Sequence, residues 1–313
     1  MQRRIVLEYA AVALCACFAL GCSHAVSDTE PAESKRRLTI LSKAPESGYT
    51  FSSIEVIAFN DDNPDHIYSR VRTTAPPLQL YLDDGIYRIF VLVNLPEFQG
   101  TSEDELFGMG ADLTCSTPEY PSMVSGAEIT VNGDDQIEFE LERLWCRIVL
   151  EGPVTMDSGT VRSIFLINIP KVRPLFSPIT GLPMYNHRGI GIDSRGEVSD
   201  PLAPKFTYYN SADLGRIPLT FYGYPNQSTE AFSRKNEDDV TKLVVAAEQN
   251  GNIRYFPIGL PDLESNKSYS ISGIHIKDRP GSTSPNRYVQ DTEAFTYTIT
   301  VKEFTNHPLS ESI

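Results

Sequence analysis

The sequence has few cysteines, a single tryptophan and a shortage of basic residues. Its 313 residues include 5 Cys, 1 Trp, 27 Lys plus Arg and 41 Asp plus Glu, for a net charge of −14. Nucleic-acid binders need a basic patch that displaces counterions, so this balance excludes a nucleic-acid partner. The 20 Gly and 22 Pro follow no period, which excludes a collagen-like chain. Hydrophobic residues make up 41%, enough for a packed core.

The sequence also lacks a run of 18 apolar residues, so it predicts no transmembrane helix. Residues 9–20 are apolar and almost uncharged, and they follow a basic Arg3-Arg4 pair. Twelve residues are too few to span a bilayer, and this arrangement is typical of a cleaved secretion signal. We therefore predict that residues 1–21 are a signal peptide.

The apolar run ends at Gly21-Cys22, and a small residue followed by cysteine is the pattern of a bacterial lipoprotein signal. In such signals the cysteine thiol takes a diacylglycerol and becomes the first residue of the mature chain. We predict lipidation at Cys22, with the lipid holding the chain at the outer membrane. Cys17 is the alternative lipidation site, and a secreted protein with an unmodified Cys22 is the other alternative.

Two further cysteines remain after removal of the signal. Residues 22–37 are polar, aperiodic and contain a proline, which predicts a flexible tether. Beyond it, Cys115 and Cys146 can form a disulfide in an oxidising compartment. Cys146 lies in the apolar run 144–150, where a buried free thiol on a strand fits equally well. Both alternatives stay open.

A period of two dominates the rest of the chain. Residues 137–142 alternate apolar side chains with glutamates, and residues 295–301 alternate them with threonines. Residues 86–93 and 163–169 are apolar on both faces, which indicates central strands. Many short strands at this spacing predict an all-β fold of antiparallel β-sandwiches. The apolar positions of the last alternating run are Phe295, Tyr297, Ile299 and Val301.

Turn residues separate these runs and suggest two domains. Asn250-Gly251 between two strand patterns predicts a hairpin turn. Residues 102–109 can form a short helix capped by Ser102. The best domain boundary is the Gly-Pro pair that follows Glu151. We predict a tandem arrangement, with an N-terminal domain over residues 38–151 and a C-terminal domain over residues 152–313.

Motifs for catalysis, cofactors or metals are missing from the predicted mature chain. It has no Gly-x-Ser-x-Gly, His-Glu-x-x-His or phosphate-binding glycine loop. His275 lies in a strand pattern and fits a structural histidine better than a metal ligand. The acidic residues 61–65 lack the register of a calcium loop and fit a solvated turn. We therefore predict that the protein is not an enzyme and that it has no cofactor and no metal site.

Several segments, in order, resemble the fimbrillin-type pilins of Bacteroidia, the subunits of lipoprotein-derived (type V) fimbriae. In that family an apolar strand ends at a characteristic Asn, and a later strand carries Arg followed by apolar residues. The resemblance covers nearly the whole mature chain, although each segment is short. The segments are IEVIAFN (54–60), YRIFVLVNLP (87–96), ERLWCRIVL (142–150), FYGYPN (221–226) and YTITVKEF (297–304).

The resemblance implies transthyretin-like β-sandwich domains and assembly by strand exchange. In the family, a protease cuts after an arginine beyond the first strand, and the C-terminal extension of another subunit fills the resulting groove. Here the removable strand would contain Leu38, Ile40 and Leu41. The donor strand would be the segment that starts at Phe295. The implied partners are other fimbrial subunits, with host or bacterial surface ligands as further partners.

This sequence departs from the family pattern where the cut is expected. No arginine occurs between residues 38 and 69. Arg36 and Arg37 precede the expected first strand, and Lys43 is the only basic residue just after it. Arg37 and Lys43 are thus the candidate processing sites. A subunit that keeps its first strand keeps its lipid and can only end a fibre, so we favour a basal, anchor or accessory subunit over a stalk subunit.

The main alternative is a surface-exposed glycan-binding or adhesive lipoprotein outside a fibre. Such proteins stack sugars on exposed aromatic side chains. The only tryptophan, Trp145, lies in a strand pattern that predicts core packing. The pairs Tyr208-Tyr209 and Tyr222 with Tyr224 keep this alternative open. A hydrolase on the same scaffold is the third and least supported alternative.

Overall fold

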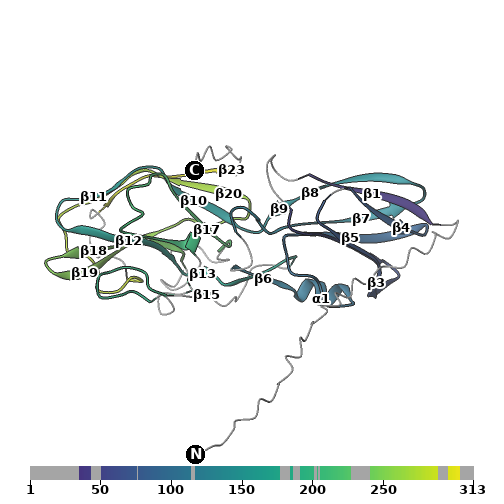
Figure 1. Ribbon diagram of the computed structural model, residues 1–313, viewed down its shortest axis with the longest axis horizontal. Helices are drawn as coiled ribbons and strands as arrows, with labels where there is room; N and C mark the ends of the chain where they lie inside the picture. The colour runs from purple at the N-terminus through teal and green to yellow at the C-terminus, as the bar shows by residue number, and fades with distance from the viewer. Residues whose placement is uncertain are drawn as a thin grey trace, which may run out of the picture. The chain divides into compact units, whose positions relative to one another are not determined.

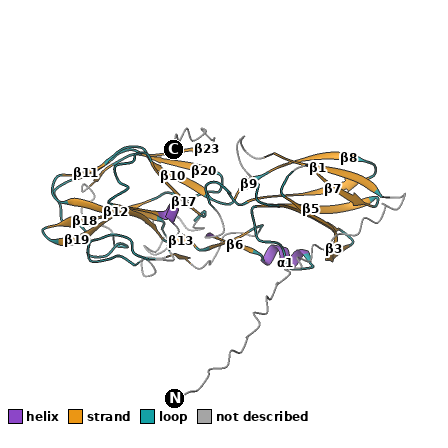
Figure 2. Ribbon diagram, in the orientation of Figure 1, coloured by secondary structure: helices purple, strands orange, loops and turns teal. Residues whose placement is uncertain are grey.

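The computed structural model describes most of the chain after residue 34, and residues 35–313 form one compact unit. Regular structure is almost entirely β-strand (Figure 2), which confirms the predicted all-β class. The helical elements described are α1 (Glu103–Gly108) and the 3-10 turn η2 (Lys205–Thr207). No helix among the described residues is long and apolar enough to cross a membrane. The described residues are 35–43, 51–75, 77–113, 117–176, 184–185, 191–200, 203, 205–226, 240–287 and 295–303.

Two sheets formed before residue 144 enclose an apolar core. Strand β1 (Arg36–Lys43) lies between β4 (Leu78–Leu82) and β8 (Asp135–Glu140) (Figure 1). The facing sheet has five strands, and both sheets contribute to one buried cluster. Its order is β3 (Asn63–Thr73), β2 (Ile54–Asn60), β5 (Gly85–Val93), β7 (Met123–Val131) and β9 (Glu142–Arg143).

Strand β5 is buried on both faces, as its continuous apolar run predicts. Ile89 and Val91 point into the cluster shared with β1. Phe90 and Leu92 point the other way, into a second cluster that extends through the C-terminal sheets. Phe90 packs edge-on against Phe107 of α1, with ring centroids 5.7 Å apart. Helix α1 begins at a complete capping box between Ser102 and Glu105, which confirms the predicted cap.

The later strands form two layers around the second cluster. One layer contains two sheets joined end to end by short connections, and the other contains a four-stranded sheet. The first layer has β17 (Leu219–Gly223), β10 (Cys146–Leu150), β20 (Lys267–Ile271) and β23 (Ile299–Glu303), then β11 (Val154–Met156), β21 (Ile274–Ile276) and β22 (Phe295–Thr296). The second has β16 (Tyr208–Asn210), β12 (Thr160–Ile167), β18 (Lys242–Gln249) and β19 (Asn252–Gly259).

Two short strand pairs complete the described β-structure. Strand β6 (Gly110–Asp112) pairs with β14 (Val172–Pro174), and β13 (Ile169–Pro170) pairs with β15 (Met184–Tyr185). The β6–β14 pair brings a segment after α1 beside a segment after β12. It thus ties together the parts of the chain on either side of the predicted boundary at residue 151, which itself stays a prediction.

Among the strands that the structure describes, three pairs are parallel, where antiparallel sandwiches were expected. They are β1 with β8, β10 with β20, and β11 with β21. Parallel neighbours need a long crossover connection, and several other strands lie between the two members of each pair in the chain. Alternation in the sequence shows which face of a strand is buried but not the direction of its neighbour.

The β18–β19 turn agrees with the sequence-based prediction, whereas the start of β1 differs from it. Strands β18 and β19 form a hairpin whose Asn250-Gly251 turn has φ of 50° and 73°, as predicted. Strand β1 differs because it begins at Arg36, two residues earlier than expected. Arg36 and Arg37 extend the strand because they lie in register with residues of β4.

Candidate strand-exchange site

Strand β1 fills the centre of its sheet. On one side it runs antiparallel to β4, with Leu38 opposite Leu80. On the other side it runs parallel to β8, with Ile40 opposite Ile137. Leu38 and Ile40 are 1% and 0% exposed and belong to the buried cluster. Removal of β1 would therefore uncover the core and break hydrogen bonding along both neighbouring strands.

The beginning of β1 is fixed by acidic residues of two turns. The Arg36 guanidinium donates to both carboxylate oxygens of Asp84, at 2.9 and 3.3 Å. This contact holds the pKa of Asp84 below and that of Arg36 above the ordinary value, through the side-chain hydrogen bond and the opposite charge. The backbone N–H of Arg37 donates to Asp134 at 2.8 Å. The two arginines thus help to hold β1 in place.

The candidate processing sites occupy different positions in β1. Arg37 is exposed, but its backbone lies in the strand opposite Tyr81. Lys43 is the last residue of β1 and lies opposite Glu140 of β8. Residues 44–50, which join β1 to β2, lie outside the described residues. The backbone of Leu41 also belongs to β1, as expected.

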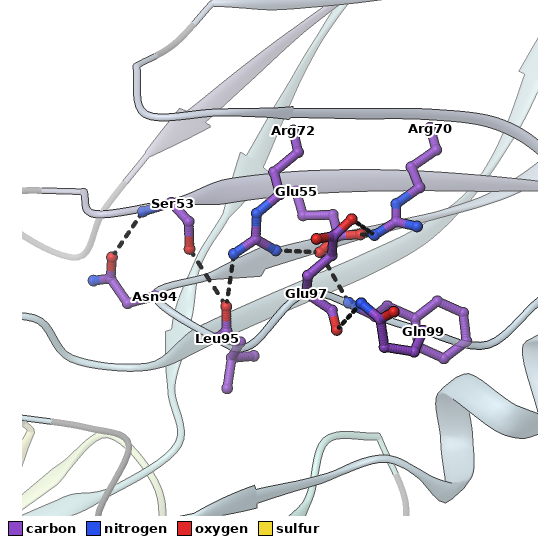
Figure 3. A network of polar contacts seen from close by, with 9 residues as sticks. Ser53, Glu55, Arg70, Arg72, Asn94, Leu95, Glu97 and Gln99 are labelled. Carbon is purple, nitrogen blue, oxygen red and sulfur yellow. Dashed lines mark hydrogen bonds and ion pairs between the residues drawn. The ribbon is translucent and has the colours of Figure 1, made fainter. Parts of the chain in front are cut away.

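A polar network holds the neighbouring strands together without using β1 (Figure 3). The buried Glu55 of β2 forms ion pairs with Arg72, at 2.6 Å, and with Arg70, both on β3. Glu55 also accepts the backbone N–H of Phe98 at 3.2 Å. Arg72 further donates to the Leu95 carbonyl at 3.1 Å. These contacts attach the loop after β5 to β2 and β3. This part of the facing sheet is therefore held together by contacts that do not involve β1.

The Asn that ends the apolar run of β5 has a clear structural role. Asn94 is 6% exposed and takes the left-handed conformation, with φ 54°. Its Oδ1 accepts the backbone N–H and the hydroxyl of Ser52, at 2.8 and 3.0 Å. Its Nδ2 donates to the Pro121 carbonyl at 3.0 Å. Asn94 therefore joins the segment before β2, the end of β5 and the segment before β7.

The candidate donor segment lies at the edge of the C-terminal layer. Backbone residues Phe295 and Thr296 form β22 against β21, and β23 pairs antiparallel with β20. Among the described strands, both β22 and β23 are terminal in their sheets. Ile299 packs against the core, whereas Tyr297 and Val301 are 37% and 51% exposed. This segment can leave with less loss of buried apolar surface than β1.

The remaining sequence-based sites divide between described and undescribed residues. Cys22 and Cys115 lie outside the described residues. Cys146 is a buried free thiol that donates to the Gly223 carbonyl at 3.3 Å. Burial raises its pKa to about 12. Of the two alternatives for Cys146, the structure shows the buried thiol.

The aromatic residues considered for sugar stacking are mostly in the core. Trp145 is 1% exposed and packs on Tyr222, with ring centroids 4.8 Å apart, which confirms the predicted core position. Tyr224 is fully buried. Tyr208 and Tyr209 are half-buried on β16, and the Tyr209 hydroxyl donates to the Thr220 carbonyl at 2.7 Å. These side chains do not form an exposed stacking platform.

His275 is held by two neighbours on the surface of β11 and the turn after it. Its Nδ1 is 3.1 Å from the Thr155 hydroxyl, and its Nε2 is 3.3 Å from Asp157. Both the histidine and the aspartate are about half exposed. No group of three or more His, Cys, Asp or Glu side chains among the described residues could hold a metal ion.

Two strands that flank the site were missed at the sequence level. Strand β4 carries a visible alternation, Leu78, Leu80 and Leu82, with all three side chains buried. Strand β3 has only half-buried and exposed side chains, so it gives no comparable pattern. Glu55, the centre of the polar network, gave no signal because its arginine partners are on another strand.

The arrangement of these strands resembles that of several solved structures. No protein-family model and no curated protein matches the chain. Solved structures do match, and they confirm the fold suggested by the fimbrillin-type resemblance.

Three of these structures cover nearly the same length as this chain. A fimbrilin (FimA) from Porphyromonas gingivalis is 12% identical, with a TM-score of 0.62 over 87% of this chain and 98% of its own. A candidate cell adhesion protein from Bacteroides eggerthii is 15% identical, with a TM-score of 0.61 over 87% and 96%. The tip fimbrial protein Mfa3 from P. gingivalis is 11% identical, with a TM-score of 0.55 over 86% and 99%. At these identities the likeness establishes the fold.

Proposed function

We propose that this protein is a structural subunit of a bacterial cell-surface fimbria that assembles by β-strand exchange, with β1 as the exchangeable strand. The proposal rests on the position of β1, which pairs with β4 and β8 and buries Leu38 and Ile40 in the core. Strand exchange needs a buried strand that lies before the other strands in the chain, so that a single cut after it releases it, and that leaves a groove which another strand can fill. Strand β1 meets both requirements.

The energetics favour replacement of β1 over simple loss. Full burial of a Leu or Ile side chain stabilises a fold by about 1.5–3 kcal/mol. Loss of β1 would expose the partners of Leu38 and Ile40 and leave the inner edges of β4 and β8 unpaired. An incoming strand with alternating apolar residues restores both the burial and the backbone hydrogen bonds.

The donor we assign is the segment 295–303 of a neighbouring subunit. It alternates apolar residues with threonines over residues 295–301, and Tyr297 and Val301 are already partly exposed. Its departure would open a sheet edge at β20 and β21, whereas departure of β1 would open the core. The other subunits of the same fibre are thus the expected partners.

Within the fimbria, we propose a basal, anchor or accessory role. Residues 38–69 contain no arginine, so an arginine-specific protease has no site between β1 and Arg70. The Arg36 side chain is engaged with Asp84, and the backbone N–H of Arg37 is engaged with Asp134. A subunit that is cut neither at Arg37 nor after β1 keeps both β1 and the proposed lipid at Cys22. It would remain at the outer membrane and receive no donor strand.

An engineered cleavage site tests strand exchange directly. A recognition sequence for a site-specific protease is placed in residues 44–50, and the same residues in scrambled order serve as the control. After cleavage, we expect polymers that grow with protein concentration, measured by light scattering and electron microscopy. The scrambled control should stay monomeric. Cleaved protein that loses β1 and still stays monomeric would rule out exchange at this strand.

The basal role has a separate test. We treat the natural chain separately with an arginine-specific and a lysine-specific protease and determine the new N-terminus by mass spectrometry. We expect Cys22 and residues 38–43 to stay on one chain and no polymers to form, because a cut after Arg37 would release the proposed lipid and leave residues 38–43 in place. A new N-terminus after residue 43, together with polymers, would instead make this protein a stalk subunit.

A further inference from the structure

A polar cavity lies where three chain connections meet, at the end of the fold that carries β11, β18 and β19 (Figure 1). One wall is the turn between β11 and β12, the second is the β18–β19 hairpin turn, and the third is the loop after β21. The cavity has a volume of about 220 Å³. Its lining is Ser158, Gln249, Asn250, Asn252, Arg254, Asp278, Arg279 and Pro280.

Hydrogen bonds fix the walls of this cavity. The side-chain amide of Gln249, which is 8% exposed, donates to the Arg279 carbonyl at 3.1 Å and accepts the Gly281 N–H at 3.3 Å. The Ser158 hydroxyl donates to Asp278 at 2.5 Å. Gly159 has φ 105°, and a Cβ there would lie 2.4 Å from the Glu248 carbonyl. The three connections are therefore packed closely and the cavity is formed in advance.

The charge in the cavity is positive on a strongly acidic chain. Arg254 and Arg279 contribute two positive charges, and Asp278 contributes one negative charge. Within the part of the chain that the structure describes, the Arg254 guanidinium has no hydrogen-bond or ion-pair partner. An arginine held by a rigid strand in a polar cavity is suited to a carboxylate.

We propose that this cavity binds a carboxylated sugar residue of a surface glycan. Arg254 binds the carboxylate. The Asn252 amide donates to the Asn250 carbonyl at 3.0 Å, which orients it in the turn. Its remaining N–H and its Oδ1, together with the Asn250 amide, donate to and accept from ring hydroxyls, and the second oxygen of Asp278 accepts from another hydroxyl. The ring of Pro280 offers a small apolar surface for a C–H face of the sugar. This ligand class combines a negative charge with several hydroxyls, as the lining requires.

Titration calorimetry on the mature full-length chain tests the proposal. The probes are glucuronic acid and N-acetylneuraminic acid, which distinguish two sources of the carboxylate, with glucose and inorganic phosphate as comparisons. We expect saturable binding of at least one sugar acid and weaker binding of glucose. The variant Arg254→Gln should bind about tenfold or more weakly. Arg216→Gln, which removes the same charge from an exposed loop, should bind like the natural chain.

Three outcomes would overturn the site. They are the absence of saturable sugar-acid binding, unchanged affinity in Arg254→Gln, and phosphate binding as tight as that of the sugar acids. Urea unfolding shows whether Arg254→Gln is folded. If it is not, Asn252→Ala decides, because Asn252 is exposed on the hairpin and a substitution there leaves the core intact. Unchanged affinity in Asn252→Ala would then reject the proposal. None of these results depends on fibre assembly.

Discussion

Asn94 and Asn168 occupy equivalent positions in two different sheets. Each directly follows a buried central strand, β5 or β12, and each has left-handed φ, 54° and 57°. The Nδ2 of Asn94 donates to Pro121, two residues before β7, and that of Asn168 donates to Val240, two residues before β18. In both cases the receiving strand is the neighbour of the strand that the asparagine ends.

The sequence around the two asparagines is also alike. Both asparagines are followed by an apolar residue and a proline, in Asn94-Leu95-Pro96 and Asn168-Ile169-Pro170. Proline favours an extended residue before it, which helps the chain leave the sheet after the left-handed asparagine. The same local solution therefore occurs once on each side of the predicted boundary at residue 151.

The first prediction concerns Asn94. Replacement by Ala removes the side-chain hydrogen bonds to Ser52, Ser53 and Pro121. It also leaves a non-glycine residue at positive φ without the polar side chain that compensates this conformation. We expect a loss of unfolding free energy of about 2–4 kcal/mol. Asn94→Gly keeps the backbone conformation accessible, so it should lose less than Asn94→Ala. Urea unfolding followed by circular dichroism measures both.

Asn250 is the matched control for Asn94. It also has positive φ, 50°, but lies exposed in the β18–β19 turn. Asn250→Gly should change the unfolding free energy by no more than about 0.5 kcal/mol. Equal effects of glycine at positions 94 and 250 would show that the asparagine side chain contributes nothing beyond its backbone conformation.

The second prediction concerns the core contact of β1. Ile40 is 0% exposed, and Ile40→Ala should lower the unfolding free energy by about 2–5 kcal/mol through lost burial and a cavity. Ile86 of β5 is 43% exposed, so Ile86→Ala should cost no more than about 0.5 kcal/mol. Urea denaturation of both variants gives the comparison. Similar losses at the two positions would mean that β1 is not a core strand in solution.

The sequence predicted the local structure of each segment better than it predicted which strands pair with one another. The two-faced apolar run of β5, the capping box at Ser102 and the Asn250-Gly251 turn depend on residues close together in the chain, so their patterns are visible. The pairing of β1 with β8 depends on residues about a hundred positions apart, and alternation carries no information about strand direction. The sequence therefore predicted that β1 is a strand but not that it is the centre of a sheet.

Single residues of the site show the same difference between what the sequence can and cannot predict. Leu38 and Ile40 could be identified because the family resemblance places the first strand there. Glu55 could not, because a glutamate in an apolar run gives no indication of the arginines that compensate its charge. The polar cavity around Arg254 was also invisible, since its lining comes from three connections that are distant in sequence.

The third prediction concerns Glu55. Its side chain is 1% exposed and pairs with two partly exposed arginines. Glu55→Gln keeps the size of the side chain but removes its charge, and we expect a loss of about 1–3 kcal/mol in unfolding free energy. Glu97→Gln is the control, because Glu97 pairs with Arg70 at 2.9 Å but is 54% exposed. It should cost no more than about 1 kcal/mol. Thermal and urea unfolding of the two variants test this difference.

The last prediction concerns the thiol of Cys146. Because the thiol is buried and its pKa is raised to about 12, a thiol reagent should label it only on unfolding. The measurement uses the mature chain with Cys22→Ser and Cys115→Ser, so that Cys146 is the only cysteine. Rapid labelling under native conditions would contradict the buried position.

The same thiol should make stability depend on alkaline pH. An unfolded cysteine loses its proton at about pH 8.5, whereas the folded one keeps it up to about pH 12. Between these values the folded state binds more protons than the unfolded state, so stability falls as pH rises, by about 1.4 kcal/mol per pH unit. Cys146→Ala removes this contribution and leaves those of tyrosines and lysines. The difference in unfolding free energy between the parent chain and Cys146→Ala should therefore be constant below pH 8 and shift against the parent above pH 9. A constant difference across this range would show that Cys146 ionises alike in both states.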